Sequence, residues 1–184
     1  MACSTQHLAP GWQWGAEMDG RIRRKLVDQY KDGHRVVLEA LAGASTAELD
    51  VAPAPGKWTA REIVHHLADS EMTSAIRLRL LVASPTPEIR AYDQDEFARL
   101  LHYGQRPIQA ALDAFGAARR TSAEILDGLT EDEWQRFGTH TEIGRYSIER
   151  WLEIYAEHAH EHARQILAAR AAAKAPLTSP RAQP

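Results

Sequence analysis

The segment SIERWLEIYAEHAHEHARQILAARA, residues 147–171, has the apolar spacing of one long amphipathic helix. At about 100° per residue, its large apolar side chains recur on a single face. His158 and His162 are four residues apart, so both imidazoles fall in the middle of that face, whereas His160 points to the opposite side. The segment therefore predicts a helix that directs a His-x3-His pair towards the interior of a helical protein.

This histidine pair has two interpretations. Two imidazoles one helical turn apart can direct their nitrogens at a common point, as they do when both bind one metal ion. Burying two imidazoles without polar partners is costly, so they need either a metal or hydrogen bonds. The alternative to a metal site is a pair of core histidines bonded to glutamate or backbone groups of neighbouring helices.

Three more long helices are predicted, over about residues 18–41, 59–83 and 107–127, because apolar residues recur there with helical spacing. A short helix is expected over about residues 93–101. No segment shows the alternation of a strand over a useful length. Together with residues 147–171, these segments predict an all-α four-helix bundle, and a sheet of three or more strands would contradict it.

The predicted helices begin at recognisable signals. Thr59 and Thr130 each precede a glutamate by three residues, the pattern of a capping box. The second box suits a single-turn helix that carries Trp134. Pro107 suits the first position of the third long helix, where its missing N–H costs nothing. Ser147 is expected to cap the fourth.

Length and composition fit one globular domain. The chain has 184 residues, of which 44% are hydrophobic and 26% charged. We expect a single helical domain over residues 1–172. The last stretch, residues 173–184, is small and proline-rich and is expected to be disordered.

Charge and cysteine content argue against several classes of protein. A net charge of -3 offers no basic face for nucleic acid or an anionic membrane. No apolar run approaches the roughly 20 residues of a membrane span, and the N-terminus lacks the pattern of a signal peptide. Cys3 is the single cysteine, which fits a reducing cytoplasm, and we interpret it as incidental. We therefore expect a soluble cytoplasmic protein.

A metal ion bound by the His-x3-His pair would need a ligand from another helix. The only other histidine cluster on a predicted long helix is His65-His66. The helical pattern does not choose between them, because both lie more than about 100° from the centre of the apolar face. Glu71 falls within that face and is either a ligand, a partner of a ligand, or paired with an arginine of the bundle.

Taken together, these motifs resemble the DinB/YfiT-like superfamily of metal-dependent four-helix proteins. The resemblance covers roughly residues 18–170 in the family's order. It rests on Lys57-Trp-Thr59 followed by His66-Leu-Ala-Asp-Ser-Glu71, on Tyr92-Asp93-Gln-Asp95, on Arg106-Pro107, on His140 with Gly144-Arg-Tyr-Ser-Ile148, and on His158-x3-His162-x2-Gln165-Ile166.

The resemblance selects a ligand set and a topology. It implies His66, rather than His65, as the ligand that joins His158 and His162. It also implies a down-up-up-down order of helices with a long crossover between the second and third. Members of the family frequently dimerise through the bundle, so a homodimer is expected.

Three neutral imidazoles and no cysteine suit a divalent ion such as zinc or nickel. Three protein ligands leave a position open, which is typical of a catalytic metal. The resemblance implies two chemistries, because some members look like thiol S-transferases that use bacillithiol, mycothiol or glutathione and others are described as metal-dependent hydrolases; we favour the transferase. The alternatives are a metal-dependent hydrolase and a non-catalytic metal-binding stress protein. In each case the expected partner is a small molecule.

Further polar residues are candidates for the surroundings of the metal or for a substrate pocket, although each taken singly is better explained by a structural role. A catalytic metal predicts a cleft at one end of the bundle, with Tyr92 and Asp93 in its wall. No Ser-His-Asp arrangement or glycine-rich phosphate loop is found. The candidates are Asp69, Glu71, Tyr92, Asp93, His140 and Gln165.

Overall fold

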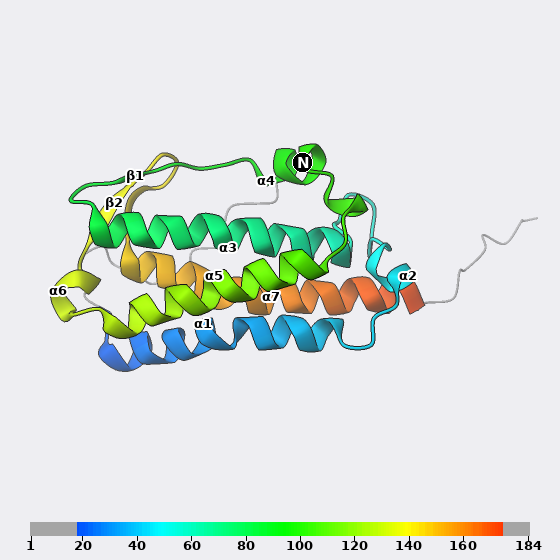
Figure 1. The fold of residues 1–184 in the computed structure, drawn as a ribbon, viewed down its shortest axis with the longest axis horizontal. Coiled ribbons are helices and arrows are strands. Elements are labelled where there is room, and N and C mark those ends of the chain that lie inside the picture. Colours follow the sequence, from blue (N-terminus) through cyan, green and yellow to red (C-terminus); the bar gives the residue numbers. More distant parts are fainter. Residues whose placement is uncertain (1–17, 175–184) are drawn as a thin grey trace, which may run out of the picture.

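Four long helices packed side by side dominate the computed structural model, which describes residues 18–174 (Figure 1). The four predicted long helices are confirmed, with ends shifted by at most three residues. The last helix continues to Lys174, and residues 175–184 of the expected tail lie outside the described residues. The four helices are α1 (Gly20–Leu41), α3 (Ala60–Ala83), α5 (Gln109–Gly128) and α7 (Ile148–Lys174).

The helices have the predicted down-up-up-down order. The colours of Figure 1 show that α1 and α7 run in one direction and that α3 and α5 run in the other. α1 packs against α5 and α7, and α3 packs against the same two helices. Because α3 and α5 are parallel, the chain must return along the whole bundle between them. Residues 84–108 form this crossover.

The crossover contains a short strand and two short helices. They are β1 (Glu88–Ile89), α4 (Gln94–Leu100) and the 3-10 helix η1 (Tyr103–Gln105), and α4 confirms the predicted short helix. The hydroxyl of Tyr103 donates a hydrogen bond of 2.5 Å to Asp69 on α3. This contact attaches the crossover to the bundle.

A small three-stranded sheet corrects the expectation that the chain has no strands. β2 (Phe137–His140) and β3 (Gly144–Ser147) form an antiparallel hairpin, and β1 pairs with β2 in parallel. The criterion that such a sheet would exclude a bundle was wrong, because strands of two to four residues do not form a layer of the fold. They are also too short for alternation to reveal them. The sheet joins the crossover to the start of α7.

The helix starts agree with the capping signals in most cases. Both predicted capping boxes are formed, and Ser147 accepts a hydrogen bond from the backbone N–H of Arg150. Pro107 is an exception, because α5 begins at Gln109 and the proline lies before its N-cap. The helical turn α6 (Glu131–Trp134) was expected. The turn α2 (Thr46–Leu49) was not, although Ser45 begins a third capping box.

The first turn of α1 buries an arginine in place of the apolar residue that helical spacing favours. Ile22 is exposed, whereas Arg23 is buried and pairs with Glu131 and Glu149. The Arg23 guanidinium also lies 4.8 Å from the centre of the Trp134 ring. Here α6 packs over the helix end, so a paired arginine replaces the apolar contact that spacing alone predicts.

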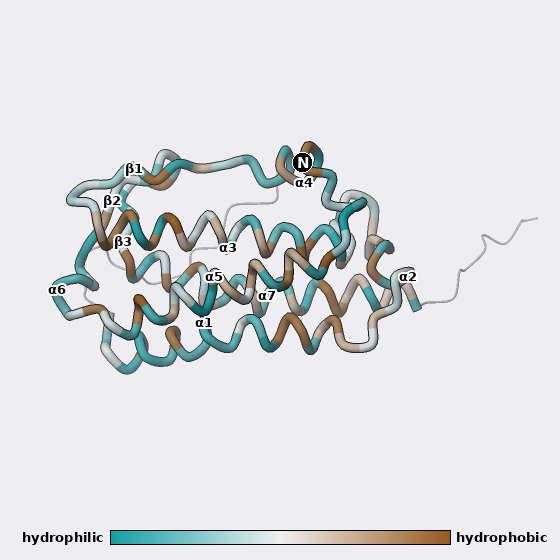
Figure 2. Tube along the Cα trace, in the orientation of Figure 1, coloured by the Kyte–Doolittle hydropathy of each residue, from teal (hydrophilic) through white to brown (hydrophobic). Residues whose placement is uncertain are grey.

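Hydrophobic residues recur along all four long helices (Figure 2) and form two buried clusters. Between the clusters, Arg119 of α5 is buried and contacts the three other helices. Its Nη1 donates to Glu71 Oε2 of α3 at 2.7 Å, and its Nε donates to the Tyr30 carbonyl of α1 at 2.6 Å. Its Nη2 donates to the Tyr155 carbonyl of α7. One side chain thus fixes the four helices relative to one another.

Gly33 allows α1 to approach this arginine closely. A Cβ atom at residue 33 would lie 2.7 Å from the Cβ of Ala159 and 2.7 Å from the Cζ of Arg119. Any larger residue would push α1 away from α7. Within residues 18–174, no helix has both the length and the apolar character needed to cross a bilayer.

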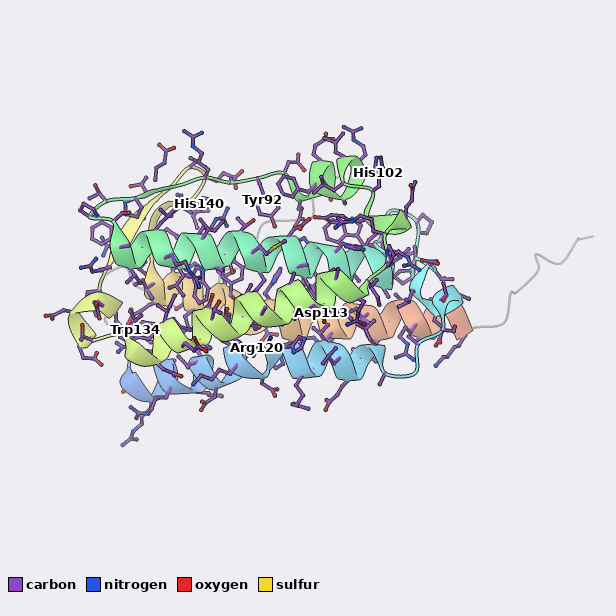
Figure 3. All side chains as sticks on the ribbon, viewed as in Figure 1. Tyr92, His102, Asp113, Arg120, Trp134 and His140 are labelled. Atoms are coloured by element: carbon purple, nitrogen blue, oxygen red, sulfur yellow. The ribbon has the colours of Figure 1, made fainter. Side chains whose placement is uncertain are left out.

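Arg119→Met should lower the free energy of unfolding by about 3–5 kcal/mol, because it leaves the fully buried Glu71 without its partner. Arg120→Met is a matched control, since Arg120 is exposed (Figure 3), and should change stability by no more than about 0.5 kcal/mol. Urea denaturation followed by circular dichroism measures both. Equal effects of the two substitutions would contradict the role given to Arg119.

Candidate metal centre

Three histidine side chains from two helices meet on one side of the bundle. The Nε2 atom of His158 on α7 lies 3.2 Å from Nε2 of His66 on α3 and 3.1 Å from Nε2 of His162. Within residues 18–174, this is the one group of three or more histidine, cysteine or acidic side chains that could hold a metal ion. The structure therefore brings together the three histidines that the resemblance selects.

The spacing of these nitrogens fits a shared metal ion. Metal–nitrogen bonds of about 2.0–2.1 Å in tetrahedral geometry separate two ligand nitrogens by about 3.3–3.4 Å. The observed 3.1 and 3.2 Å are close to that spacing. The Nδ1 atom of His158 is buried and has no hydrogen-bond partner among the described residues. The Nε2 atom is thus the nitrogen through which this ring contacts the two neighbouring imidazoles.

Neighbouring side chains hold the rings in this arrangement. Trp58, which precedes the cap of α3, packs against His66 with ring centres 4.8 Å apart. The Nδ1 atom of His162 lies 3.0 Å from Oε1 of Gln165, one turn further along α7. The amide oxygen accepts a hydrogen bond from Nδ1–H, which leaves the lone pair of His162 on Nε2. Gln165 therefore orients one of the three rings.

Burial lowers the pKa of all three imidazoles. The pKa of His66 falls to about 3, mainly through burial and also through the charge of His162. The pKa of His158 is held well below its usual value by burial and by the two neighbouring histidines. Burial lowers the pKa of His162, although its hydrogen bond with Gln165 opposes this. Neutral rings keep the lone pairs that metal binding requires.

The three rings differ in exposure. His66 is buried, whereas His158 and His162 retain partial exposure. Both imidazole rings are nevertheless strongly desolvated, because protein atoms surround them on most sides. One side of the cluster is therefore within reach of solvent.

Sequence comparison places the chain in a family. The model described as DinB superfamily matches residues 29–166. The chain belongs to the DinB superfamily.

Curated DinB-like relatives match most of this chain. A protein of Oceanobacillus iheyensis named "Putative metal-dependent hydrolase" is 31% identical over 151 residues, which cover 82% of this chain and 87% of the relative. "Putative metal-dependent hydrolase YfiT" of Bacillus subtilis is 30% identical over 149 residues, covering 76% of this chain and 84% of YfiT. These names attach metal dependence to the relatives.

A solved structure shares the topology of this DinB-superfamily bundle. YfiT from Bacillus subtilis superposes with a TM-score of 0.78 and 26% sequence identity, covering 84% of this chain and 89% of YfiT. It is described as "a probable metal-dependent hydrolase with an unusual four-helix bundle topology". The unusual order of helices is thus shared by the two proteins.

His65, which precedes His66, and His160, which lies between His158 and His162, face other parts of the DinB-like fold. His65 is buried beneath the crossover, where its Nε2 lies 3.2 Å from the Arg106 carbonyl and its ring stacks on Tyr103. His160 was expected to face solvent, but it is half-buried and its Nε2 lies 3.1 Å from the Gln29 carbonyl. The close approach of α1 to α7 covers the side of α7 that the helical pattern leaves free.

Two acidic candidates on α3 are occupied by structural partners. Asp69 accepts the hydrogen bond of Tyr103. Glu71 pairs with Arg119 and accepts a 2.5 Å hydrogen bond from the hydroxyl of Tyr30, so the interpretation as an arginine partner describes it. Burial raises the pKa of Glu71, and the charge of Arg119 opposes that rise.

The remaining candidates lie along the crossover and the hairpin. Asp93 is exposed and caps α4 by accepting hydrogen bonds from two backbone N–H groups. Tyr92 packs against Phe97 with ring centres 4.6 Å apart. His140 is buried on β2, and its Nδ1 accepts a hydrogen bond from the backbone N–H of Glu142. Figure 3 shows Tyr92 and His140 between the crossover and α3.

Two surface hollows lie away from the histidine cluster. One is lined by the end of α3 and by residues after α6, including Ala83 and Phe137. The other lies between α1 and α7 and includes His160. Neither includes Tyr92 or Asp93, so the cleft expected beside the metal site stays a prediction.

Sequence reasoning missed the arginine that organises the core. Arg119 shares the helical spacing of the buried residues Leu112, Phe115, Ala123 and Leu126. A charged residue in such a series signals a buried pair, and Glu71 occupies the equivalent place on α3. The pairing of Arg119 with Glu71 could therefore have been predicted from the places of the two residues on the buried faces of α5 and α3.

The metal-free protein should lose stability as the pH falls below about 6.5, the usual histidine pKa. The cluster stays neutral in the folded state, whereas the unfolded chain binds protons near that usual pKa. The stabilisation is therefore present above about pH 6.5 and lost below it, by up to about 1.4 kcal/mol per pH unit for each histidine.

Urea denaturation of chelator-treated protein at pH 7.5, 6.5 and 5.5 measures this dependence. His66→Ala should reduce the slope of stability against pH by up to about 1.4 kcal/mol per pH unit, since it removes one of the histidines whose pKa burial lowers. An unchanged slope in this variant would show that the cluster does not cause the pH dependence.

Proposed function

We propose that this protein binds one divalent metal ion, zinc or nickel, through the Nε2 atoms of His66, His158 and His162, and that it is a metal-dependent enzyme. The convergence of the three rings carries the proposal, because His158 lies at the spacing of metal ligands from both others and all three ligand atoms lie within 4.8 Å of one another. The neutral state of the rings and the hydrogen bond from His162 to Gln165 support it. The names of the relatives agree with metal dependence.

Three imidazole ligands suit catalysis better than a purely structural role. A structural zinc ion is usually closed by four protein ligands, whereas three leave a position for a small molecule. The partial exposure of His158 and His162 gives such a molecule access. A bound ion would supply Lewis acidity, which lowers the pKa of a coordinated water or thiol. Trp58 would shield the buried side of the site through its contact with His66.

The reaction that we propose is transfer of a low-molecular-weight thiol, such as bacillithiol, mycothiol or glutathione, to an electrophilic carbon. The thiol loses its proton, a carbon–sulfur bond forms, and the leaving group departs with the bonding electron pair. The resemblance of the DinB motifs around His66 and His158 supports this reaction. Hydrolysis is the second candidate, and the names of the relatives favour it.

Substitution of single histidines tests the metal site. His66→Ala, His158→Ala and His162→Ala should each abolish tight metal binding, because each removes one of three ligands. His65→Ala and His160→Ala should bind metal almost as well as the unaltered protein, since both rings contact backbone carbonyls instead. Metal analysis of untagged, dialysed protein and calorimetric titration give the comparison. Equal losses in all five variants would refute the assignment.

Chelation and thiol dependence separate the candidate functions. A thiol S-transferase should consume thiol in the presence of an electrophile at a rate that a chelator abolishes and added zinc or nickel restores. A hydrolase should respond to the chelator and ignore the thiol. Metal-replete protein that turns over no member of a broad electrophile and ester panel would favour a non-catalytic metal-binding protein.

A further inference from the structure

Arg77 lies on the same face of α3 as His66 and has unmet hydrogen-bonding capacity. The two residues are eleven positions apart, about three helical turns. The Arg77 Nη1 donates to the Tyr155 hydroxyl at 3.3 Å, and its Nη2 donates to the Arg90 carbonyl at 2.5 Å. Its Nε atom is buried and has no hydrogen-bond partner among the described residues. A buried donor of a charged group without a partner is costly.

The absence of an acidic partner sets Arg77 apart from other shielded arginines. Arg23, Arg61, Arg119 and Arg170 each lie within 4.0 Å of a carboxylate. Within residues 18–174, Arg77 has no carboxylate at that distance. Its charge is therefore not neutralised by the described part of the chain, although the crossover half-covers it.

A second hydrogen-bond donor, on His140, lies near enough to Arg77 to be affected by its charge. The backbone N–H of Glu142 donates to Nδ1 of His140 at 3.2 Å, so the neutral His140 ring carries its proton on Nε2. The ring is buried, and both burial and the charge of Arg77 lower its pKa. Glu142, which raises this pKa, is exposed to solvent. The region therefore gathers hydrogen-bond donors around an unpaired cation.

The aromatic rings of this region connect it to the histidine cluster. The ring of Tyr155 lies 5.8 Å, centre to centre, from His158, and its hydroxyl contacts Arg77. The Arg77 guanidinium lies 5.8 Å from the centre of the Tyr92 ring. Tyr155 therefore touches the cluster at one end and Arg77 at the other.

We propose that Arg77, with the Tyr155 hydroxyl and the Nε2–H of His140, forms a seat for the carboxylate of the small molecule whose reactive group binds at the histidine cluster. One unpaired cation matches a group with one negative charge, and a guanidinium with neighbouring donors matches a carboxylate. The inference rests on the proposed metal-dependent function and adds a class of substrate, an acid with a separate metal-binding or reactive end.

Matched metal-binding probes test this seat without knowledge of the substrate. The cobalt(II)-loaded protein is titrated with the monohydroxamates of succinic, adipic and suberic acid, and with the uncharged hydroxamates of butanoic, hexanoic and octanoic acid. The visible spectrum of cobalt reports binding at the histidine cluster. At one chain length, the carboxylate probe should bind at least about tenfold more tightly than its uncharged match, because it gains a charge-assisted hydrogen bond.

Substitutions test whether Arg77 causes the tighter binding of the carboxylate probes. Arg77→Met should remove it and leave the affinity for the uncharged probe within about twofold of the original. Arg79→Met, a change at an exposed arginine two residues away, should keep it. Arg77→Lys retains the charge without the Nε–H and should keep part of the preference, which provides a second test if Arg77→Met does not fold.

Three results would overturn the seat. One is equal affinity for charged and uncharged probes at every length. The second is a preference that survives Arg77→Met. The third is a spectral change with the uncharged probes and none with the charged ones, which would mean that a carboxylate is not accepted beside the ion. Failure of the proposed function itself would be seen separately, as cobalt binding that does not depend on His66, His158 and His162.

Discussion

The buried contact between Arg119 and Glu71 is the interaction on which the arrangement of the bundle depends. From α5, the guanidinium reaches a carboxylate on α3 and carbonyl groups on α1 and α7. Two charges can be buried at low cost only when their geometry is satisfied, so this contact tolerates few alternative positions of the helices. The level of Arg119 is also the level of Tyr155, one turn before His158. The same contact that holds the bundle therefore fixes α3 against α7, where His66 meets the histidine pair.

The proposed function rests on two groups of residues that this frame positions. The first is the histidine cluster, whose rings are neutral, desolvated and within metal-ligand distance. The second is the proposed carboxylate site beneath the crossover, which centres on Arg77, an arginine without a carboxylate within 4.0 Å among the described residues. The parallel arrangement of α3 and α5 makes this second group possible, because it requires a long connection that passes back over the face carrying His66. In this DinB-superfamily protein, topology and site are thus linked.

Much of this arrangement could be predicted from the sequence, since its signals are local. Helical spacing and capping boxes located the four long helices, and the spacing of His158 and His162 placed both rings on one face. Local sequence patterns did not predict features that depend on contacts between distant segments of the chain. The strands are too short for a pattern, and His160 is covered by α1 because Gly33 allows close packing. The choice of His66 over His65 depended on resemblance, because both residues are buried, His65 against the crossover and His66 against α7, and only tertiary structure separates their surroundings.

The central claim is that three imidazoles share one metal ion. X-ray absorption spectroscopy of the zinc-loaded protein tests it most directly, because the extended fine structure counts imidazole ligands and measures their distances. The account predicts three imidazole nitrogens at about 2.0–2.1 Å together with one or two oxygen ligands from solvent. A site with two or fewer imidazoles, or one completed by sulfur, would contradict it.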